Sequence, residues 1–159
     1  MSDDDQSLAE RIVAAMMAKD AFSQWLGITV LEVRPRLATV RMTVRPEMVN
    51  GFGVSHGGIA YSVADSALAF ASNTHGRVTV SIENAITYPA PVRVGDVLTA
   101  HAEEEGASNK LAYYRVTVRR QQDDAIVGLF RGTVYRTNTA FFARGDAGDE
   151  ASEGSEDST

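Results

Sequence analysis

The chain has 159 residues, enough for one domain, and 44% of them are hydrophobic, which excludes a wholly disordered protein. The absence of cysteine excludes disulfide frameworks, thiolate-bound zinc, iron–sulfur clusters and cysteine nucleophiles. No apolar run approaches the roughly 18 residues of a membrane span, and a start with three aspartates at positions 3–5 is unlike a secretory signal. We therefore expect a cytoplasmic protein that does not bind membranes.

The net charge of −6 is carried by the two ends of the chain. Residues 144–159 hold six acids and one arginine, and the aspartates at 3–5 add three more negative charges, so the segment between them is slightly basic. A tail of Gly, Ser, Asp and Glu cannot bury enough apolar area to offset its ordering entropy, so we predict disorder over 139–159. Without a clustered basic face, no nucleic-acid partner is expected.

The first predicted element is a helix over about 7–24, where Ser7 and Glu10 fit a capping box. Two strands follow, over about 28–34 and 37–45. The second strand alternates apolar with polar residues, which is typical of an antiparallel sheet with one face in water. The chain therefore begins as a helix followed by a strand pair.

A glycine-rich loop over 46–58 leads into a predicted helix over 59–75, with Gly76 as its C-cap. This helix carries an unusual number of small residues, namely Ala60, Ala64, Ala67, Ala69 and Ala71. Small residues on every side indicate a helix held closely by a sheet, because a surface helix would show one polar face.

Four more strands are predicted, with no second long helix among them, over about 77–88, 97–105, 111–121 and 125–136. The class is therefore α+β, with an antiparallel sheet curved around one long central helix. We divide the chain into an N-terminal helix with an acidic leader (1–26), a main domain (27–138) and the acidic tail (139–159). The open edges of such a sheet favour a homodimer.

The chemically most informative stretch runs from Asn50 to Asp65. His56, Gly57 and Gly58 stand where the loop enters the long helix, and free backbone N–H groups at a helix start favour developing negative charge. Glycine at this place also lets a substrate carbonyl come close to the backbone. Asp65 interrupts an apolar helix about two turns further on, too deep to be a cap. An anion-stabilising helix start and one carboxylate are the parts that acyl transfer needs.

The H-G-G sequence at 56–58, Asp65, and the segments VSIENAITY (80–88) and PAPVRVGD (89–96) resemble the hot-dog-fold acyl-CoA thioesterases, in particular their phenylacetic-acid-degradation (PaaI-type) branch. The resemblance covers about 20–136. It implies the hot-dog fold and hydrolysis of phenylacetyl-CoA, or of a ring-hydroxylated aryl-acetyl-CoA, to the free acid and CoA. It also implies that acyl-CoA is the only small-molecule partner, with neither metal nor cofactor.

By position, the resemblance makes Asp65 the general base or nucleophile and the Gly57 N–H the oxyanion donor. It implies that His56 orients the loop or the thioester, that Asn50 positions water or the thioester, and that Ser81 meets the acid across a dimer interface. Each site would then be built from two chains of a homodimer, within a homotetramer.

Two further residues are expected to bind substrate. Gly58 belongs to the same helix start, and Lys110 falls near a hairpin that lies close to CoA in the family. His75 is expected to be a surface residue without a partner.

Other interpretations remain open at this point. Asp65 alone is also typical of a structural carboxylate bonded to Ser62 or Ser66. Residues 53–57 match G-x-S-x-G, the nucleophile elbow of α/β-hydrolases, which would make Ser55 the nucleophile but requires a parallel sheet. A hot-dog domain that senses acyl-CoA without hydrolysing it, and a thioesterase for medium-chain acyl-CoA, are the functional alternatives.

Overall fold

The fold is seen in a computed structural model, which describes residues 2–143. Two helices open the chain, two strands follow, and a long helix separates these from four further strands. The elements are α1 (Asp3–Lys19), α2 (Ala21–Leu26), β1 (Thr29–Arg34), β2 (Leu37–Thr43), the short 3-10 helix η1 (Pro46–Met48), α3 (Gly57–Asn73), β3 (Arg77–Thr87), β4 (Val97–Ala107), β5 (Leu111–Arg120) and β6 (Ala125–Ala140). The predicted α+β class is confirmed.

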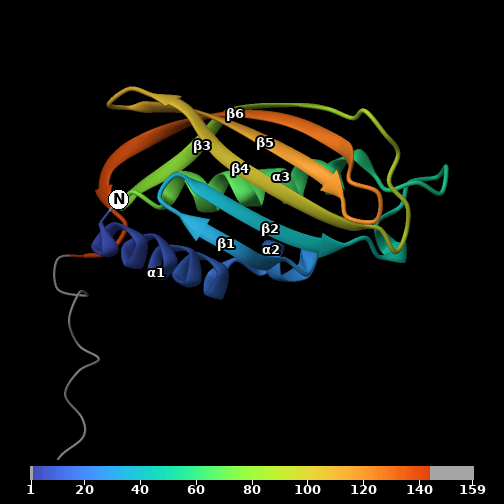
Figure 1. Cartoon of the computed structure of the whole chain (residues 1–159), viewed down its shortest axis with the longest axis horizontal. Helices are drawn as coiled ribbons and strands as arrows, with labels where there is room; N and C mark the ends of the chain where they lie inside the picture. Colours follow the sequence, from blue (N-terminus) through green and yellow to red (C-terminus); the bar gives the residue numbers. More distant parts are fainter. Residues whose placement is uncertain (1, 144–159) are drawn as a thin grey trace, which may run out of the picture.

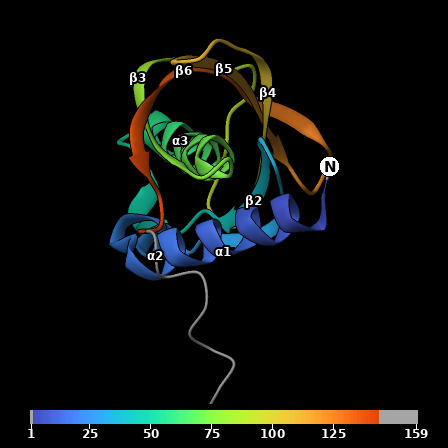
Figure 2. The same ribbon diagram turned by 90° about the vertical axis from the view of Figure 1, so that its left-hand side faces the viewer.

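The six strands form one antiparallel sheet in the order β1-β2-β4-β5-β6-β3. After α3 the chain enters β3 at the far edge, and β4 returns to pair with β2. The sheet curves around α3 (Figure 1). In the second view, α1 and α2 lie across the side of α3 that the sheet leaves open (Figure 2). The predicted arrangement of one long helix inside a curved sheet is confirmed.

α3 can approach the sheet closely because many of its buried residues are small. Ala64, Ala67 and Ala71 have no exposed surface, and the larger Leu68 and Phe70 are equally buried. The distance between packed elements depends on the side chains at their contact, so alanines bring the helix backbone near the strands. A side chain on α3 is consequently within reach of side chains on the strands.

The N-terminal segment differs from the single helix predicted over 7–24. α1 begins earlier because Ser2 and Asp5 form the capping box, in which the Asp5 N–H donates to Ser2 Oγ at 3.1 Å. Three aspartates in the first turn favour the same start, since they lie at the positive end of the helix dipole. Asp20 then separates the two helices and caps α2 by accepting from the Ser23 N–H.

A β-bulge in the edge strand β3 decides which of its side chains face α3. The register shifts between Ser81 and Glu83, so that Ser81 pairs with Val134 while Asn84 pairs with Gly132. Directly paired residues lie on the same face of a sheet, so Ser81 and Asn84 share a face although they are three residues apart. Strict alternation along the strand would place them on opposite faces.

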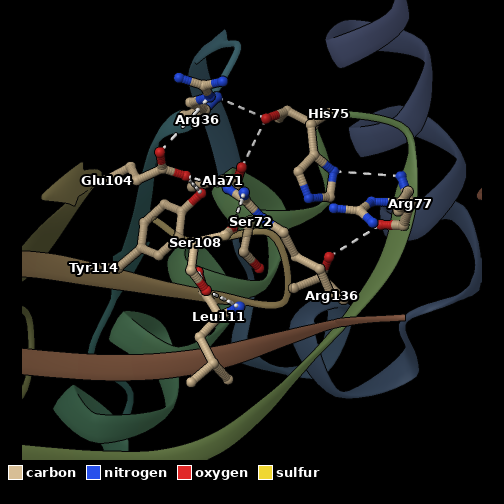
Figure 3. Close-up of polar contacts among 12 residues, drawn as sticks. Arg36, Ala71, Ser72, His75, Arg77, Glu104, Ser108, Leu111, Tyr114 and Arg136 are labelled. Carbon is tan, nitrogen blue, oxygen red and sulfur yellow. Dashed lines mark hydrogen bonds and ion pairs between the residues drawn. The ribbon is translucent and has the colours of Figure 1, made fainter. Parts of the chain in front are cut away.

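A buried polar cluster lies where the C-terminal end of α3 meets β4, β5 and β6 (Figure 3). Arg136 and Glu104 form an ion pair at 2.5 Å, with side chains only 8% and 10% exposed. Tyr114 donates its hydroxyl to the same carboxylate at 3.0 Å. His75 accepts from the Arg77 N–H at 3.3 Å, and burial, followed by nearby arginines, lowers the pKa of His75 to about 4. The sequence suggested a surface residue, but His75 is half-buried within this cluster.

The main domain extends slightly beyond its predicted boundary. β6 continues to Ala140, and the Phe141 N–H donates to Gly76 O at 2.8 Å, so the ordered chain reaches past residue 138. The rest of the predicted tail, 144–159, lies outside the described residues. Within residues 2–143, no helix has both the length and the apolar character that a transmembrane helix requires.

Candidate active site

The N-terminus of α3 presents an unpaired backbone donor. His56 is the N-cap, and its Nδ1 accepts from the Gly58 N–H at 2.9 Å. The Ile59 N–H donates to His56 O at 2.9 Å. The Gly57 N–H has no acceptor among residues 2–143 and lies at the positive end of the helix dipole. The Gly57 N–H is therefore free to donate to a ligand, and His56 fixes the first turn behind it.

Asn50 shapes the loop that leads to this helix start. Its Oδ1 accepts from the Phe52 N–H at 2.9 Å, and its N–H donates to Val54 O at 2.8 Å. The Asn50 NH₂ group has no acceptor among the described residues, so it is available to a ligand. The same turn leaves the Phe52 ring 93% exposed beside the helix start.

Asp65 lies half-buried in the middle of α3, where Asn84 of β3 donates its amide Nδ2 to Oδ1 at 2.9 Å. Ser62 and Ser66, which were the alternative hydrogen-bond partners for Asp65, bind other groups. Ser62 donates to Gly58 O at 2.6 Å, and the Ser66 hydroxyl lies 2.9 Å from that of Ser23. The interpretation of Asp65 as a carboxylate bonded to a neighbouring serine is therefore wrong.

Burial raises the pKa of Asp65, and the hydrogen bond from Asn84 partly opposes this by stabilising the ionised form. No charged side chain within residues 2–143 contributes to the shift. A carboxylate with a raised pKa is a better proton acceptor near neutral pH, which suits a general base.

The structure separates the predicted site residues into two groups within one chain. Gly57 and Asp65 are eight residues apart on the same helix, a separation of about 12 Å along its axis. A donor and a base that serve the same carbonyl must both lie within hydrogen-bond reach of it or of its attacking water. The Gly57 and Asp65 of one chain are too far apart to do so.

The two remaining predicted residues lie near β3 and in a hairpin. Ser81 does not contact Asp65 directly; its hydroxyl donates to Asn84 Oδ1 at 2.8 Å. Lys110 is exposed between β4 and β5 and contacts the Tyr135 hydroxyl at 3.2 Å. Because Tyr135 pairs with Val80 near the start of β3, Lys110 lies at the opposite end of the sheet from the α3 N-terminus.

Sequence reasoning missed Asn84 and Tyr88. Asn84 holds the carboxylate, and the Tyr88 hydroxyl donates to Gly57 O at 2.9 Å. A signal for Asn84 existed in the sequence, since it is the one polar residue among Val80, Ile82, Asn84 and Ile86, which alternate along the strand. No comparable signal marked Tyr88, because its role depends on the approach of β3 to the helix start.

The surroundings of Ser55 do not form a nucleophile elbow. All strand pairings in the sheet are antiparallel, and Ser55 lies in a loop where it bridges Val49. The parallel sheet that the α/β-hydrolase motif requires is thus missing from residues 2–143. Within the same residues, no group of three or more His, Asp or Glu side chains is arranged to hold a metal ion.

The amino-acid sequence is similar to those of known thioesterases. A family model of the thioesterase superfamily matches residues 52–127. Acyl-coenzyme A thioesterase PaaI of Escherichia coli is 36% identical over 122 residues, 77% of this chain and 86% of that protein. Human acyl-coenzyme A thioesterase 13 is 31% identical over 138 residues, 84% of this chain and 96% of that protein.

The similarity extends to three dimensions. The solved structure of the E. coli PaaI protein from the phenylacetic acid degradation operon matches with a TM-score of 0.82 and 33% identity, and covers 85% of this chain and 97% of that one. Gly57 and Asp65 both lie within residues 52–127, which match the family model. The chain therefore belongs to the thioesterase superfamily and has the hot-dog fold.

Proposed function

We propose that the protein is an acyl-CoA thioesterase that hydrolyses phenylacetyl-CoA, or a ring-hydroxylated aryl-acetyl-CoA, to the free acid and CoA. The observation that carries the proposal is the half-buried Asp65 carboxylate on the helix whose first N–H, that of Gly57, is unpaired. Two relatives named acyl-coenzyme A thioesterase support the reaction. The operon named for the E. coli structure supports the aryl-acetyl group.

In the proposed reaction, water attacks the thioester carbonyl carbon while Asp65 accepts a proton from it. The oxyanion that forms is stabilised by the Gly57 N–H, and a donor of this kind typically contributes about 3–4 kcal/mol at the transition state. When the oxyanion collapses, the C–S bond breaks and the proton on Asp65 passes to the departing thiolate. Because a thioester is already activated and its thiolate leaves readily, we propose that the reaction uses no metal or cofactor.

We further propose that each site combines two copies of the chain. The roughly 12 Å between Gly57 and Asp65 supports this, because a partner copy can bring its Asp65 to the Gly57 N–H of the first. β3 has an unpaired edge, and on it Val80 and Ile82 are 47% and 57% exposed. Pairing of two β3 edges would form a homodimer, and two dimers a homotetramer.

The other predicted residues keep supporting roles in this proposal. His56 holds the helix start, Gly58 leaves room for the His56 ring, from whose Nδ1 a Cβ atom at 58 would lie 3.0 Å, and Asn50 offers its NH₂ group to the thioester or to water. We propose that Ser81 meets the acid across the dimer interface, while within its own chain it contacts Asn84. Lys110 is a candidate for the CoA phosphates because it is cationic and exposed in the β4–β5 hairpin.

The reaction is tested with purified protein and an acyl-CoA panel, with a thiol reagent to detect released CoA. We expect higher kcat/KM for phenylacetyl-CoA and hydroxyphenylacetyl-CoA than for octanoyl-CoA or palmitoyl-CoA. A flat profile or a preference for fatty acyl chains would refute the aryl-acetyl assignment, and a maximum at octanoyl-CoA would identify a medium-chain thioesterase.

The role of Asp65 is tested by Asp65→Asn, with Asp4→Asn as a matched control because Asp4 is exposed on α1. Loss of the base should lower kcat by about 10²–10⁴-fold, while the control stays at the wild-type rate. Full activity of Asp65→Asn would refute the mechanism.

Tight binding of phenylacetyl-CoA by the wild-type protein, without thiol release, would instead show an acyl-CoA sensor. Single turnover in H₂¹⁸O separates the two roles of Asp65, since label in its carboxylate would mean that it acts as nucleophile.

A further inference from the structure

Asn84 of β3 connects Asp65 of α3 with the exposed Ser81 of its own strand. Its Nδ2 donates to Asp65 Oδ1 at 2.9 Å, and its Oδ1 accepts from the Ser81 hydroxyl at 2.8 Å. An ionised carboxylate can only accept, so it takes the NH₂ end of the Asn84 amide, and the Ser81 hydroxyl donates to the Oδ1 that remains. The bulge between Ser81 and Glu83 makes this contact possible, because it brings Ser81 onto the face of Asn84.

Space for the Asn84 side chain is provided by a glycine on the neighbouring strand. Gly132 of β6 pairs directly with Asn84. A Cβ atom at position 132 would lie 2.8 Å from Asn84 Oδ1 and 2.5 Å from Leu68 Cδ2 of α3. Real Cβ atoms essentially never approach other heavy atoms this closely, so a side chain at 132 would displace both the Leu68 methyl group and the Asn84 amide. The absence of a side chain at Gly132 therefore leaves space for Asn84 as well as for Leu68.

The hydrogen bond from Asn84 makes the two carboxylate oxygens of Asp65 different from each other. Oδ1 is held by Asn84, whereas Oδ2 has no partner among residues 2–143. A side chain held at one oxygen keeps one orientation, and the second oxygen then points in a fixed direction. A carboxylate with one free, oriented oxygen can accept the proton of a single positioned water molecule.

We propose that Asn84 is a positioning residue for thioester hydrolysis, whose amide, held by Ser81 and accommodated by Gly132, orients the Asp65 carboxylate. This rests on the proposed function, because it assigns Asn84 to the reaction in which Asp65 is the base. Asn84 also favours the ionised form of Asp65, since its N–H donates to the charged form and opposes the effect of burial on the pKa of Asp65.

The first experiment follows Asp65 itself by NMR titration of its ¹³C-labelled carboxyl group. Asn84→Ala removes the donor but leaves the burial, so the pKa of Asp65 should rise by about one unit, as expected for the loss of a hydrogen bond to a charged group. The matched control is Asn138→Ala, which changes an exposed asparagine of β6. The pKa of Asp65 should be the same in this control as in the wild type. An unchanged Asp65 pKa in Asn84→Ala would overturn the proposal.

The second experiment measures kcat against pH for the same variants. In Asn84→Ala the acid limb of the kcat profile should move to higher pH by the same amount as the pKa of Asp65 measured by NMR. At pH values above the Asp65 pKa of both the wild type and the variant, kcat of the variant should remain about tenfold below wild type, because the carboxylate is no longer oriented. A pH-independent loss with an unshifted limb would show a merely structural role and overturn the proposal.

Gly132→Ala provides an independent perturbation. The added Cβ displaces the Asn84 amide, so the acid limb should shift as in Asn84→Ala, and the double variant should show no additional shift. Additive shifts in the double variant would overturn the link between the two residues. If the wild-type protein hydrolyses no thioester, the proposed function fails, whereas the NMR titration still decides whether Asn84 controls Asp65.

Discussion

Tyr88 lies directly against Gly57, so that the end of β3 holds the start of α3. The tyrosine hydroxyl donates to Gly57 O at 2.9 Å, and a Cβ atom at position 57 would lie 3.2 Å from both the ring and the hydroxyl oxygen. Burial raises the pKa of Tyr88, which favours the protonated hydroxyl that donates this bond. The free N–H of Gly57 is thus held in a fixed position. A residue larger than glycine at 57 would require Tyr88 to move.

Two substitutions of Gly57 separate steric from hydrogen-bond effects. Gly57→Ala adds only the tight contact with Tyr88 and should lower kcat/KM a few-fold. Gly57→Pro also removes the N–H, at a helix position where proline is well tolerated, so kcat should fall by a further 10²–10³-fold or so. Thiol-release kinetics measure both variants, with thermal unfolding as the control for folding. Equal activity of the proline and alanine variants would exclude the Gly57 N–H as oxyanion donor.

The buried ion pair of Arg136 with Glu104 should contribute more to the free energy of unfolding than an ion pair at the surface. Glu104→Gln leaves the buried Arg136 without its counter-charge and should lower the free energy of unfolding by about 3–5 kcal/mol. Glu103→Gln is the matched control, because Glu103 pairs with Arg115 at the surface and should contribute at most about 1 kcal/mol. Urea unfolding of both variants tests this, and similar losses would contradict it.

His75 should make the protein less stable in acid. Its pKa is about 4 in the folded protein and near 6.5 as the ordinary value, so the unfolded chain binds its proton first as the pH falls. Stability is therefore fully present above pH 6.5 and declines toward pH 4, by about 1–2 kcal/mol for a half-buried ring.

His75→Gln removes this contribution and should flatten the dependence of the free energy of unfolding on pH over the same range. The ring titration can be followed directly by proton NMR of the wild-type protein. A midpoint close to 6.5 would contradict the expected behaviour of His75.

The proposed dimer is tested at the edge of β3. Ile82→Lys places a charge on the exposed edge and should convert dimers or tetramers to monomers, as measured by light scattering. Activity should fall with the loss of the dimer, because the Gly57 and Asp65 of one chain cannot serve the same thioester. Val94→Lys changes an exposed hydrophobic residue outside the strands and should affect neither property. A fully active monomeric Ile82→Lys would refute the two-chain site.

Local sequence patterns determined the order of elements and the character of the central helix. The alanines of α3 predicted a helix enclosed by a sheet. That helix was predicted over 59–75, and it begins two residues earlier, at Gly57, and ends at Asn73. The position of Asp65 within an apolar helix was equally visible. The first helix was predicted less well, since three consecutive aspartates and Ser2 start α1 before the predicted cap.

The tertiary structure alone decided which side chains meet. Asn84 reaches Asp65 because β3 lies at the edge of the sheet, a bulge turns Ser81 to the same face, and Gly132 leaves the necessary space. These contacts join segments far apart in the sequence. The alternation of residues along a strand predicts which of them share a face. It predicts neither a register shift nor the residue that lies opposite on the neighbouring strand. The environment of Asp65 therefore became visible only in the folded structure, where the strands surround α3.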